Sequence, residues 1–205
     1  MAWADDIIIC DAHATQTRVI AAAPSDMPFS SDPEVRANWT NSVVDMVKTT
    51  GIDGITFDYE SAIPQGDIMM QQYIQIINET NIALKNENAG YQVSVCAAWT
   101  PGLPNGIDGR AYDYKALSDA SDFLYVMQYD TRSQIYDQCV ASANCPLPIN
   151  KKGIQDYLGI GIQPNKLIMG IPWYGYNYPC ENSGNNQTET CDLKLVPFRG
   201  VNCSS

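Results

Sequence analysis

The chain has 205 residues, 45% of them hydrophobic and 10% aromatic, which is the composition of a globular protein with room for one sizeable core. Its 23 acidic and 12 basic residues give a net charge of -11, which repels phosphate backbones and anionic lipids and so argues against nucleic acid and membranes as partners. No stretch approaches the roughly 18 apolar residues of a membrane span, and the apolar residues 7–10 are too few for the core of a signal peptide.

Strand-like and helix-like patterns alternate along the chain. Asp32 and Pro33 mark the start of the first long helix, Gly51 marks its end, and His13 falls in the loop before the first strand. In chain order we expect a strand at residues 18–23, a helix at 33–48, a strand at 54–60, a helix at 67–87, a strand at 91–99, a short helix near 112–117, a strand at 123–129, a short helix near 154–158 and a strand at 167–171.

Strands that are apolar on both faces and separated by helices predict a parallel sheet covered by helices. Both a doubly wound sheet and a closed barrel fit this order, and the periodicity does not choose between them. No glycine-rich phosphate loop follows a predicted strand, which argues against a dinucleotide-binding Rossmann fold.

Two acidic residues alternate along the predicted strand at residues 54–60. Thr56, Asp58 and Glu60 should line one face, with the carboxylates about 7 Å apart at Cα, while the apolar residues between them face the helices. Like charges at this distance do not both ionise freely, so one carboxyl keeps its proton to a higher pH and can act as a general acid. We assign that role to Glu60, which is nearer the rim. A Mg²⁺ or Ca²⁺ site is the alternative reading of such a pair.

Polar and aromatic residues also gather where the other predicted strands end. In a parallel barrel the carboxyl ends of the strands form one rim, which carries the functional residues. Trp99 and Trp173 could each stack on a sugar ring or simply pack at this rim. The strand ends contain Asp58 and Glu60, Ala98 and Trp99, Gln128 to Asp130, and Pro172 to Tyr174.

Residues 53–60 resemble the D-G-x-x-x-D-x-E signature of glycoside hydrolase family 18, the chitinase family of (β/α)₈ barrels. Residues 127–130 are similar to the M-x-Y-D of that family, and residues 169–176 resemble its seventh-strand segment. One branch of the family shares a further order of segments, found here at residues 172–176, 180–191 and 196–200. The resemblance runs from about Cys10 to the last residue.

The resemblance implies an α/β fold in which the five predicted strands are the third to seventh of a TIM barrel. Residues 1–205 would then form a single partial barrel domain that lacks the first two strands and the last. We expect the complete barrel to be a monomer. Because a partial barrel has open apolar edges, we expect this segment alone to be poorly stable and weakly active or inactive.

The resemblance also implies a reaction, the retaining, substrate-assisted hydrolysis of β-1,4-linked N-acetylglucosamine in chitobiose units of N-glycans or chitin fragments. Glu60 would protonate the leaving oxygen, Asp58 would orient the 2-acetamido N–H, Tyr129 would hold its oxygen and Asp130 would bind hydroxyl groups. Neither a cofactor nor a metal is implied. Further substrate contacts would come from Trp99, Met127, Trp173 and Tyr174. Methionine is more often core filler than a site residue, so from residue type alone we expect Met127 and Met169 in the core.

Two features leave the activity open. Many family members have Asp or Asn where this chain has Thr56, so a second carboxylate relay to Asp58 is missing and the pH profile is uncertain. The missing strands favour a second class of function, a chitinase-like sugar-binding lectin or an inactive fragment. Retention of Glu60 argues for the enzyme, because a lectin has no chemical need for that carboxyl group.

Cysteines and glycosylation sequons indicate the compartment. Cys180 and Cys191 bracket a polar loop and are expected to close it as a disulfide in an oxidising compartment; no C-x-x-C is present and His13 is the only histidine, which argues against zinc. Sequons at Asn38, Asn78, Asn186 and Asn202 favour a lysosomal or secreted glycoprotein whose leader is absent from this sequence, against the alternative of a cytosolic chain with chance sequons.

Overall fold

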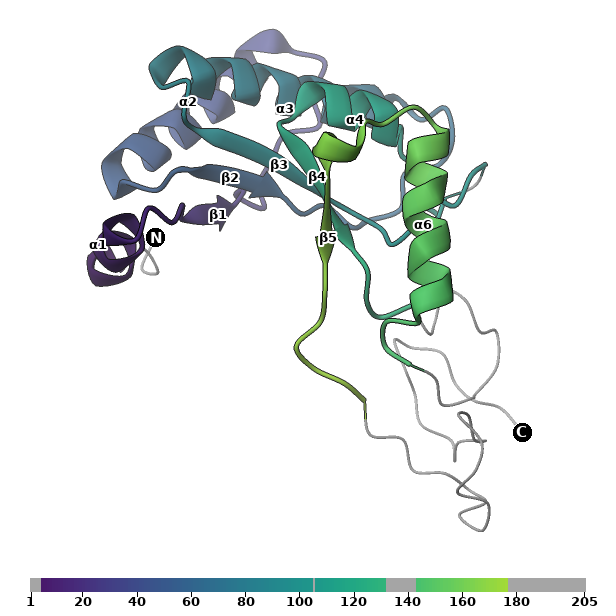
Figure 1. Ribbon diagram of the computed structural model, residues 1–205. Helices are drawn as coiled ribbons and strands as arrows, with labels where there is room; N and C mark the ends of the chain where they lie inside the picture. The colour runs from purple at the N-terminus through teal and green to yellow at the C-terminus, as the bar shows by residue number, and fades with distance from the viewer. Residues whose placement is uncertain (1–4, 105, 132–142, 177–205) are drawn as a thin grey trace.

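The computed structural model describes residues 5–104, 106–131 and 143–176, which contain a parallel sheet of five strands in the order β1-β2-β3-β4-β5 (Figure 1). A doubly wound sheet reverses its order at a switch point, whereas these strands follow one another in sequence as they do in a barrel. The prediction of a parallel α/β sheet is confirmed. The strands are β1 (Ile20–Ala22), β2 (Gly54–Phe57), β3 (Gln92–Ala97), β4 (Phe123–Met127) and β5 (Leu167–Gly170).

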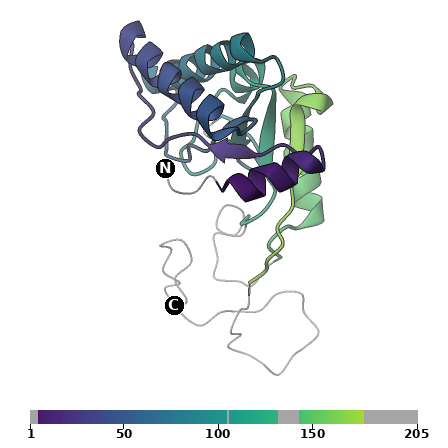
Figure 2. The same cartoon turned by 90° about the vertical axis from the view of Figure 1, so that its left-hand side faces the viewer.

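Helices lie between successive strands, α1 precedes the first strand, and most of the described helices begin at a capping aspartate. The carboxylates of Asp5, Asp32, Asp67 and Asp113 each accept a hydrogen bond from a backbone N–H in the first turn that follows. In both views α2 and α3 lie on the same side of the sheet (Figure 1, Figure 2). The helices are α1 (Asp6–Ala14), α2 (Pro33–Thr50), α3 (Ile68–Glu87), α4 (Tyr114–Ala120) and α6 (Leu147–Gly159), followed by a 3-10 turn, η1 (Pro164–Lys166).

Helix α1 was not predicted, and His13 lies within it and not in a loop. Ile7 and Ile8 are exposed and only Ile9 is buried, so the helix has no apolar face for a period to reveal. His13 Nε2 lies 2.9 Å from Asp53 Oδ2, which also accepts a hydrogen bond from Val19 N at 2.7 Å. Asp53 therefore ties α1 and the start of β1 to the start of β2.

The start of helix α6 and the exposure of Met169 also differ from the prediction. Helix α6 begins at Leu147 and not near Ile154, because Pro148 stands in its first turn, where proline needs no N–H partner, and does not break it. Met169, expected in the core, is half exposed on β5, next to exposed Ile168.

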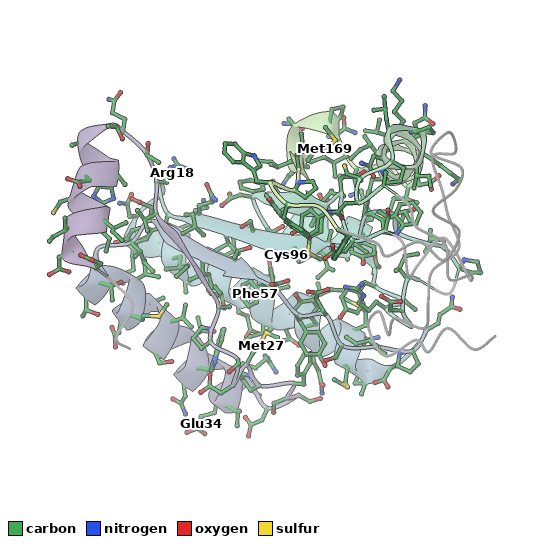
Figure 3. The ribbon with its side chains drawn as sticks, turned by 90° about the horizontal axis from the view of Figure 1, so that it is seen from below. Arg18, Met27, Glu34, Phe57, Cys96 and Met169 are labelled. Atoms are coloured by element: carbon green, nitrogen blue, oxygen red, sulfur yellow. The ribbon has the colours of Figure 1, made fainter. Side chains whose placement is uncertain are left out.

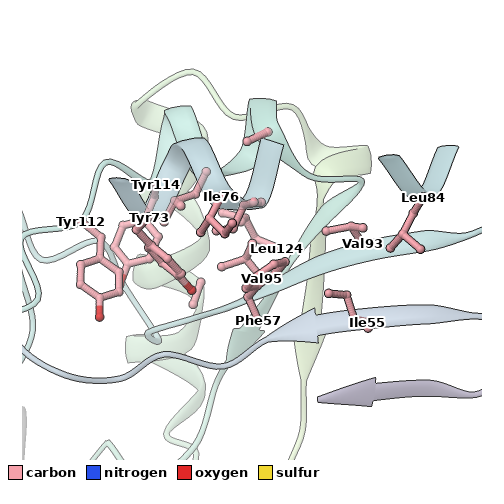
Figure 4. Close-up of a cluster of buried hydrophobic side chains, with 14 of the residues drawn as sticks. Ile55, Phe57, Tyr73, Ile76, Leu84, Val93, Val95, Tyr112, Tyr114 and Leu124 are labelled. Carbon is pink, nitrogen blue, oxygen red and sulfur yellow. The ribbon is translucent and has the colours of Figure 1, made fainter. Parts of the chain in front are cut away.

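The core lies between the sheet and the helices above it (Figure 4). Ile55 and Phe57 of β2 are fully buried against Tyr73 and Ile76 of α3, and the ring centroids of Phe57 and Tyr73 are 6.3 Å apart in an edge-on contact. Neighbouring strands add Val93, Val95 and Leu124 to the same layer. This packing fixes which face of β2 is left for polar residues.

The strand register brings the carboxyl ends together. Phe57 pairs with Val95, Ala97 with Val126, and Met127 with Gly170. The segments that follow β2, β3, β4 and β5 therefore leave the sheet at one common edge, where the sequence places the acidic and aromatic residues.

Candidate active site

Six of the predicted site residues line one hollow of about 150 Å³ at the carboxyl edge of the sheet. The last residue of β4 and the segments after β2, β3 and β4 supply them, as expected when parallel strands end at one rim. Two further residues, Ala98 and Arg110, complete the wall. The predicted residues in this wall are Asp58, Glu60, Trp99, Met127, Tyr129 and Asp130.

The two carboxylates lie just beyond β2 and on its open side. Ile55 and Phe57 are buried, whereas Asp58 and Glu60 are exposed, so the alternation predicted from the sequence is observed. The strand itself ends at Phe57, which is shorter than the predicted 54–60. Both carboxyl groups thus reach the hollow from the same side.

Glu60 is held by an arginine that the sequence analysis missed. Arg110 Nη1 lies 2.9 Å from Glu60 Oε2, and the arginine side chain is 4% exposed while that of Glu60 is 49% exposed. Arg110 belongs to the loop between β3 and α4, and 50 residues separate the pair. No sequence signal connects them, because the path of a loop is not encoded in strand periodicity.

Asp58 has a thiol below it. Cys96 of the central strand β3 lies near the middle of the sheet (Figure 3), with its Sγ 3.7 Å from Thr56 Oγ1. Burial, together with the neighbouring Asp58 carboxylate, raises the pKa of Cys96 to about 12. Asp58 therefore has Thr56 and Cys96 beside it, where the second carboxylate relay is absent from this chain. Alternation along the strand predicted at residues 91–99 could have placed Cys96 on this face.

Tyr129 and Asp130 follow β4, which adjoins β3 on the side opposite to β2. Burial raises the pKa of Tyr129, which keeps its phenol protonated and able to donate a hydrogen bond. Asp130 has a left-handed backbone, with φ of 53°, and its Oδ1 accepts hydrogen bonds from Tyr174 at 2.7 Å and from Tyr176. Asp130 thus has partners across the rim before any sugar binds.

The sequence matches a known family over most of its length. The model of glycosyl hydrolases family 18 matches residues 25–200. The chain belongs to glycoside hydrolase family 18. Di-N-acetylchitobiase of Mus musculus is 38% identical over 200 residues, which are 98% of this chain and 53% of the relative; the protein of that name in Homo sapiens is 37% identical over 204 residues, 98% of this chain and 51% of the relative. The chain therefore spans about half the length of the curated relatives it matches.

Solved structures of family 18 confirm the fold. A chitinase mutant of Cycas revoluta in complex with (GlcNAc)4 matches with a TM-score of 0.73 at 19% identity, over 93% of this chain and 59% of that one. The predicted TIM-barrel class is thus shown, with the sheet of the described residues as a part of the barrel.

The remaining predicted contacts of this family 18 chain lie around the hollow. Trp99 is buried, and its indole N–H has no hydrogen-bond partner among the described residues. Tyr174 packs edge-on against Tyr129, with ring centroids 6.3 Å apart, and so borders the site. Trp173 is 100% exposed and does not line the hollow. Its role as a sugar contact stays a prediction.

Other predicted features fall partly outside the described residues. Asn38 on α2 and Asn78 on α3 are exposed, whereas Asn186, Asn202, Cys180 and Cys191 lie beyond the described ranges. Within residues 5–104, 106–131 and 143–176, no cluster of three or more His, Cys, Asp or Glu could hold a metal ion. No helix in those ranges is long and apolar enough to cross a membrane.

The raised pKa of Cys96 predicts a slow reaction with alkylating agents. Only the thiolate attacks iodoacetamide, and with a pKa of about 12 Cys96 is almost entirely thiol at pH 8. In the folded protein we expect peptide mass spectrometry to show Cys96 labelled at least about tenfold more slowly than the exposed Cys10, with the difference lost after unfolding. Equal rates in the folded state would contradict the placement of Cys96 below Asp58.

Proposed function

We propose that this protein hydrolyses β-1,4-linked N-acetylglucosamine oligosaccharides with retention of configuration, the substrate's own 2-acetamido group acting as the nucleophile. The observation that carries the proposal is the convergence of Asp58, Glu60 and Tyr129 on one hollow at the carboxyl edge of a family 18 sheet. The relatives named di-N-acetylchitobiase and the chitinase bound to (GlcNAc)4 support this class of substrate.

The first half of the reaction uses all three side chains. The acetamido oxygen attacks the anomeric carbon and forms an oxazolinium ring, while Glu60 gives a proton to the departing glycosidic oxygen. Asp58 accepts a hydrogen bond from the acetamido N–H and stabilises the positive charge that develops there. Tyr129, kept protonated by burial, donates to the acetamido oxygen and holds it in line.

In the second half, Glu60 acts as the base. It removes a proton from a water molecule that attacks the anomeric carbon, the ring opens, and the acetamido group is restored. Two displacements at one carbon give net retention. The exposure of Glu60 lets this water reach it.

The sugar-binding lectin is the second candidate. It is favoured by the exposed aromatic residues Trp173 and Tyr174, whose rings can stack on sugars without any proton transfer. A lectin would bind chitooligosaccharides at the same rim without turnover.

A pair of fluorogenic substrates tests the proposed reaction in protein that carries the complete barrel. We expect turnover of a chitobioside and none of the matching cellobioside, because the latter has a hydroxyl where the attacking acetamido group must be. Rates are measured by release of the fluorophore, and binding of both sugars by calorimetry. Equal hydrolysis of the two substrates would rule out acetamido participation, and binding without hydrolysis of either would leave the lectin.

We also propose that the protein travels the secretory route to a lysosomal or extracellular site. Exposure of Asn38 and Asn78 supports this, since glycans need surface positions. Packing gives an alternative explanation for the threonines of these two sequons. Thr40 and Thr80 are buried between α2 and α3, with their hydroxyl oxygens 3.5 Å apart. Glycopeptide analysis of protein secreted from eukaryotic cells would decide whether either asparagine is modified.

A further inference from the structure

We infer that Arg110 is a positioning residue that holds the carboxyl group of Glu60 through Oε2 and thereby directs Oε1 to the substrate. The inference rests on the proposed function, in which Glu60 transfers the proton. Arg110 lies 50 residues from Glu60 in the sequence and contacts the family signature at Glu60, the last residue of that signature.

Arg110 is the fixed member of the pair. Its side chain is 4% exposed, and all three of its nitrogens are engaged: Nη1 with Glu60 Oε2 at 2.9 Å, Nη2 with Asp108 Oδ2 at 3.3 Å, and Nε with the carbonyl oxygen of Ile107 at 3.3 Å. The guanidinium plane is therefore locked before it meets Glu60. Of the two carboxylate oxygens of Glu60, only Oε2 has a hydrogen-bond partner among the described residues. Oε1 is therefore the oxygen left for proton transfer.

The loop that carries Arg110 is shaped by residues with left-handed backbones. Gly106, Asp108 and Gly109 have φ of 74°, 53° and 73°. A Cβ on Gly106 would lie 1.9 Å from the carbonyl oxygen of Arg110, so only glycine permits this close turn. The next residue is tied to the segment after β2, where Ala111 N donates to the carbonyl oxygen of Ile63 at 3.0 Å.

The same loop also holds the backbone of Glu60. The Tyr112 hydroxyl oxygen lies 3.1 Å from the carbonyl oxygen of Tyr59 and 2.6 Å from that of Ser61, the two residues that flank Glu60. Burial raises the pKa of Tyr112, so the phenol remains a donor to these carbonyls. The rings of Tyr59 and Tyr112 are stacked, with centroids 6.5 Å apart. Backbone and carboxyl group of Glu60 are thus fixed by one loop.

Stability alone does not explain the ion pair of Arg110 and Glu60. A buried arginine must be desolvated, and apolar side chains of the same volume often serve stability as well or better. The geometric control that Arg110 exerts is of more value to a proton donor, because a displacement of about 1 Å can lower the rate on the order of 100-fold.

The chain contains a matched control. Arg36 on α2 is 3% exposed and pairs with Glu79 of α3 through Nε at 2.9 Å and Nη2 at 3.0 Å, away from the hollow. Arg36→Met removes a buried guanidinium from one carboxylate, that of Glu79, and Arg110→Met removes one from the carboxylates of Glu60 and Asp108. Any loss that follows from that removal alone should appear in both variants.

The experiment compares Arg110→Met, Arg110→Lys and Arg36→Met with the wild type in chitobioside hydrolysis. We expect Arg110→Met to lower kcat on the order of 100-fold with KM unchanged. Arg110→Lys, which keeps the charge but replaces the planar guanidinium with a single ammonium nitrogen, should fall between Arg110→Met and the wild type, and Arg36→Met should keep the wild-type kcat. If Arg110→Met fails to fold, Arg110→Lys carries the comparison.

A second readout does not require activity. In protein labelled with carboxyl-¹³C glutamate, the Glu60 resonance is assigned by its absence in Glu60→Gln, and it should move in Arg110→Met but not in Arg36→Met. Inactivity of a wild type that carries the complete barrel would refute the proposed function and leave this spectrum to decide on Arg110. Equal kcat in Arg110→Met and Arg36→Met, or a Glu60 resonance unmoved by loss of Arg110, would overturn the inference while the glycosidase stands.

Discussion

Replacing Glu60 with glutamine is expected to lower kcat for a chitobioside by roughly 10²- to 10⁴-fold while sugar binding is retained. The amide has the shape of the carboxyl group, and its oxygen can still accept the Arg110 hydrogen bond now made at 2.9 Å. What it lacks is a proton of the acidity needed to leave with the glycosidic oxygen. Initial rates at saturating substrate measure the loss, and calorimetry with chitotriose measures binding.

Glu79→Gln provides the control for this substitution. Glu79 is likewise a carboxylate paired with a buried arginine, Arg36, but it lies on α3 away from the hollow. Its amide variant should turn over the chitobioside at the wild-type rate. If Glu60→Gln did the same, Glu60 would lose its assigned role as proton donor.

The result also separates the two candidate functions. A lectin needs Glu60 only for contact, so its amide variant would change affinity and there would be no turnover to lose. An enzyme loses rate and keeps affinity. Parallel measurement of both quantities on one pair of proteins therefore decides between the proposals without reference to any relative.

Strand periodicity was sufficient to place the two acids. Because side chains alternate along a strand, burial of Ile55 and Phe57 obliges Asp58 and Glu60 to face the other way, and the structure shows them exposed. The parallel register then brings the segment with Tyr129 to the same edge. The choice of a barrel over a doubly wound sheet did not follow from periodicity and depended on the family signature.

Residues held by loops were beyond this reasoning. Arg110 reaches Glu60 because Gly106, Asp108 and Gly109 turn the chain with positive φ, a tertiary outcome that no repeat of apolar residues encodes. Helix α1 was not predicted because its apolar residues are mostly exposed and form no periodic pattern. Its cap at Asp5 and contacts such as that of His13 with Asp53 hold it in place.

The glycine of the family signature has a structural explanation. Gly54 begins β2 with φ of 147°, and a Cβ at this position would lie 1.9 Å from the carbonyl oxygen of Gln92 on β3. Gly54 and Gln92 are partners in the parallel ladder, so the two backbones cannot move apart to make room for a Cβ without breaking the pairing of β2 and β3. The glycine therefore allows β2 and β3 to pair where the strand that carries Asp58 and Glu60 begins.

Gly54→Ala is accordingly expected to lower the free energy of unfolding by about 4 kcal/mol or more, measured by urea denaturation followed by circular dichroism. Two other glycines separate the causes. Gly51 also has a positive φ, of 72°, but open space around its Cβ position, so Gly51→Ala should lose only about 1–2 kcal/mol from backbone strain. Gly159 has neither constraint, and its alanine variant should stay within about 1 kcal/mol of the wild type. A Gly54→Ala protein no less stable than Gly51→Ala would show that β2 and β3 do not approach each other as closely as described, and with that the common origin of the rim residues on adjacent strands would lose its support.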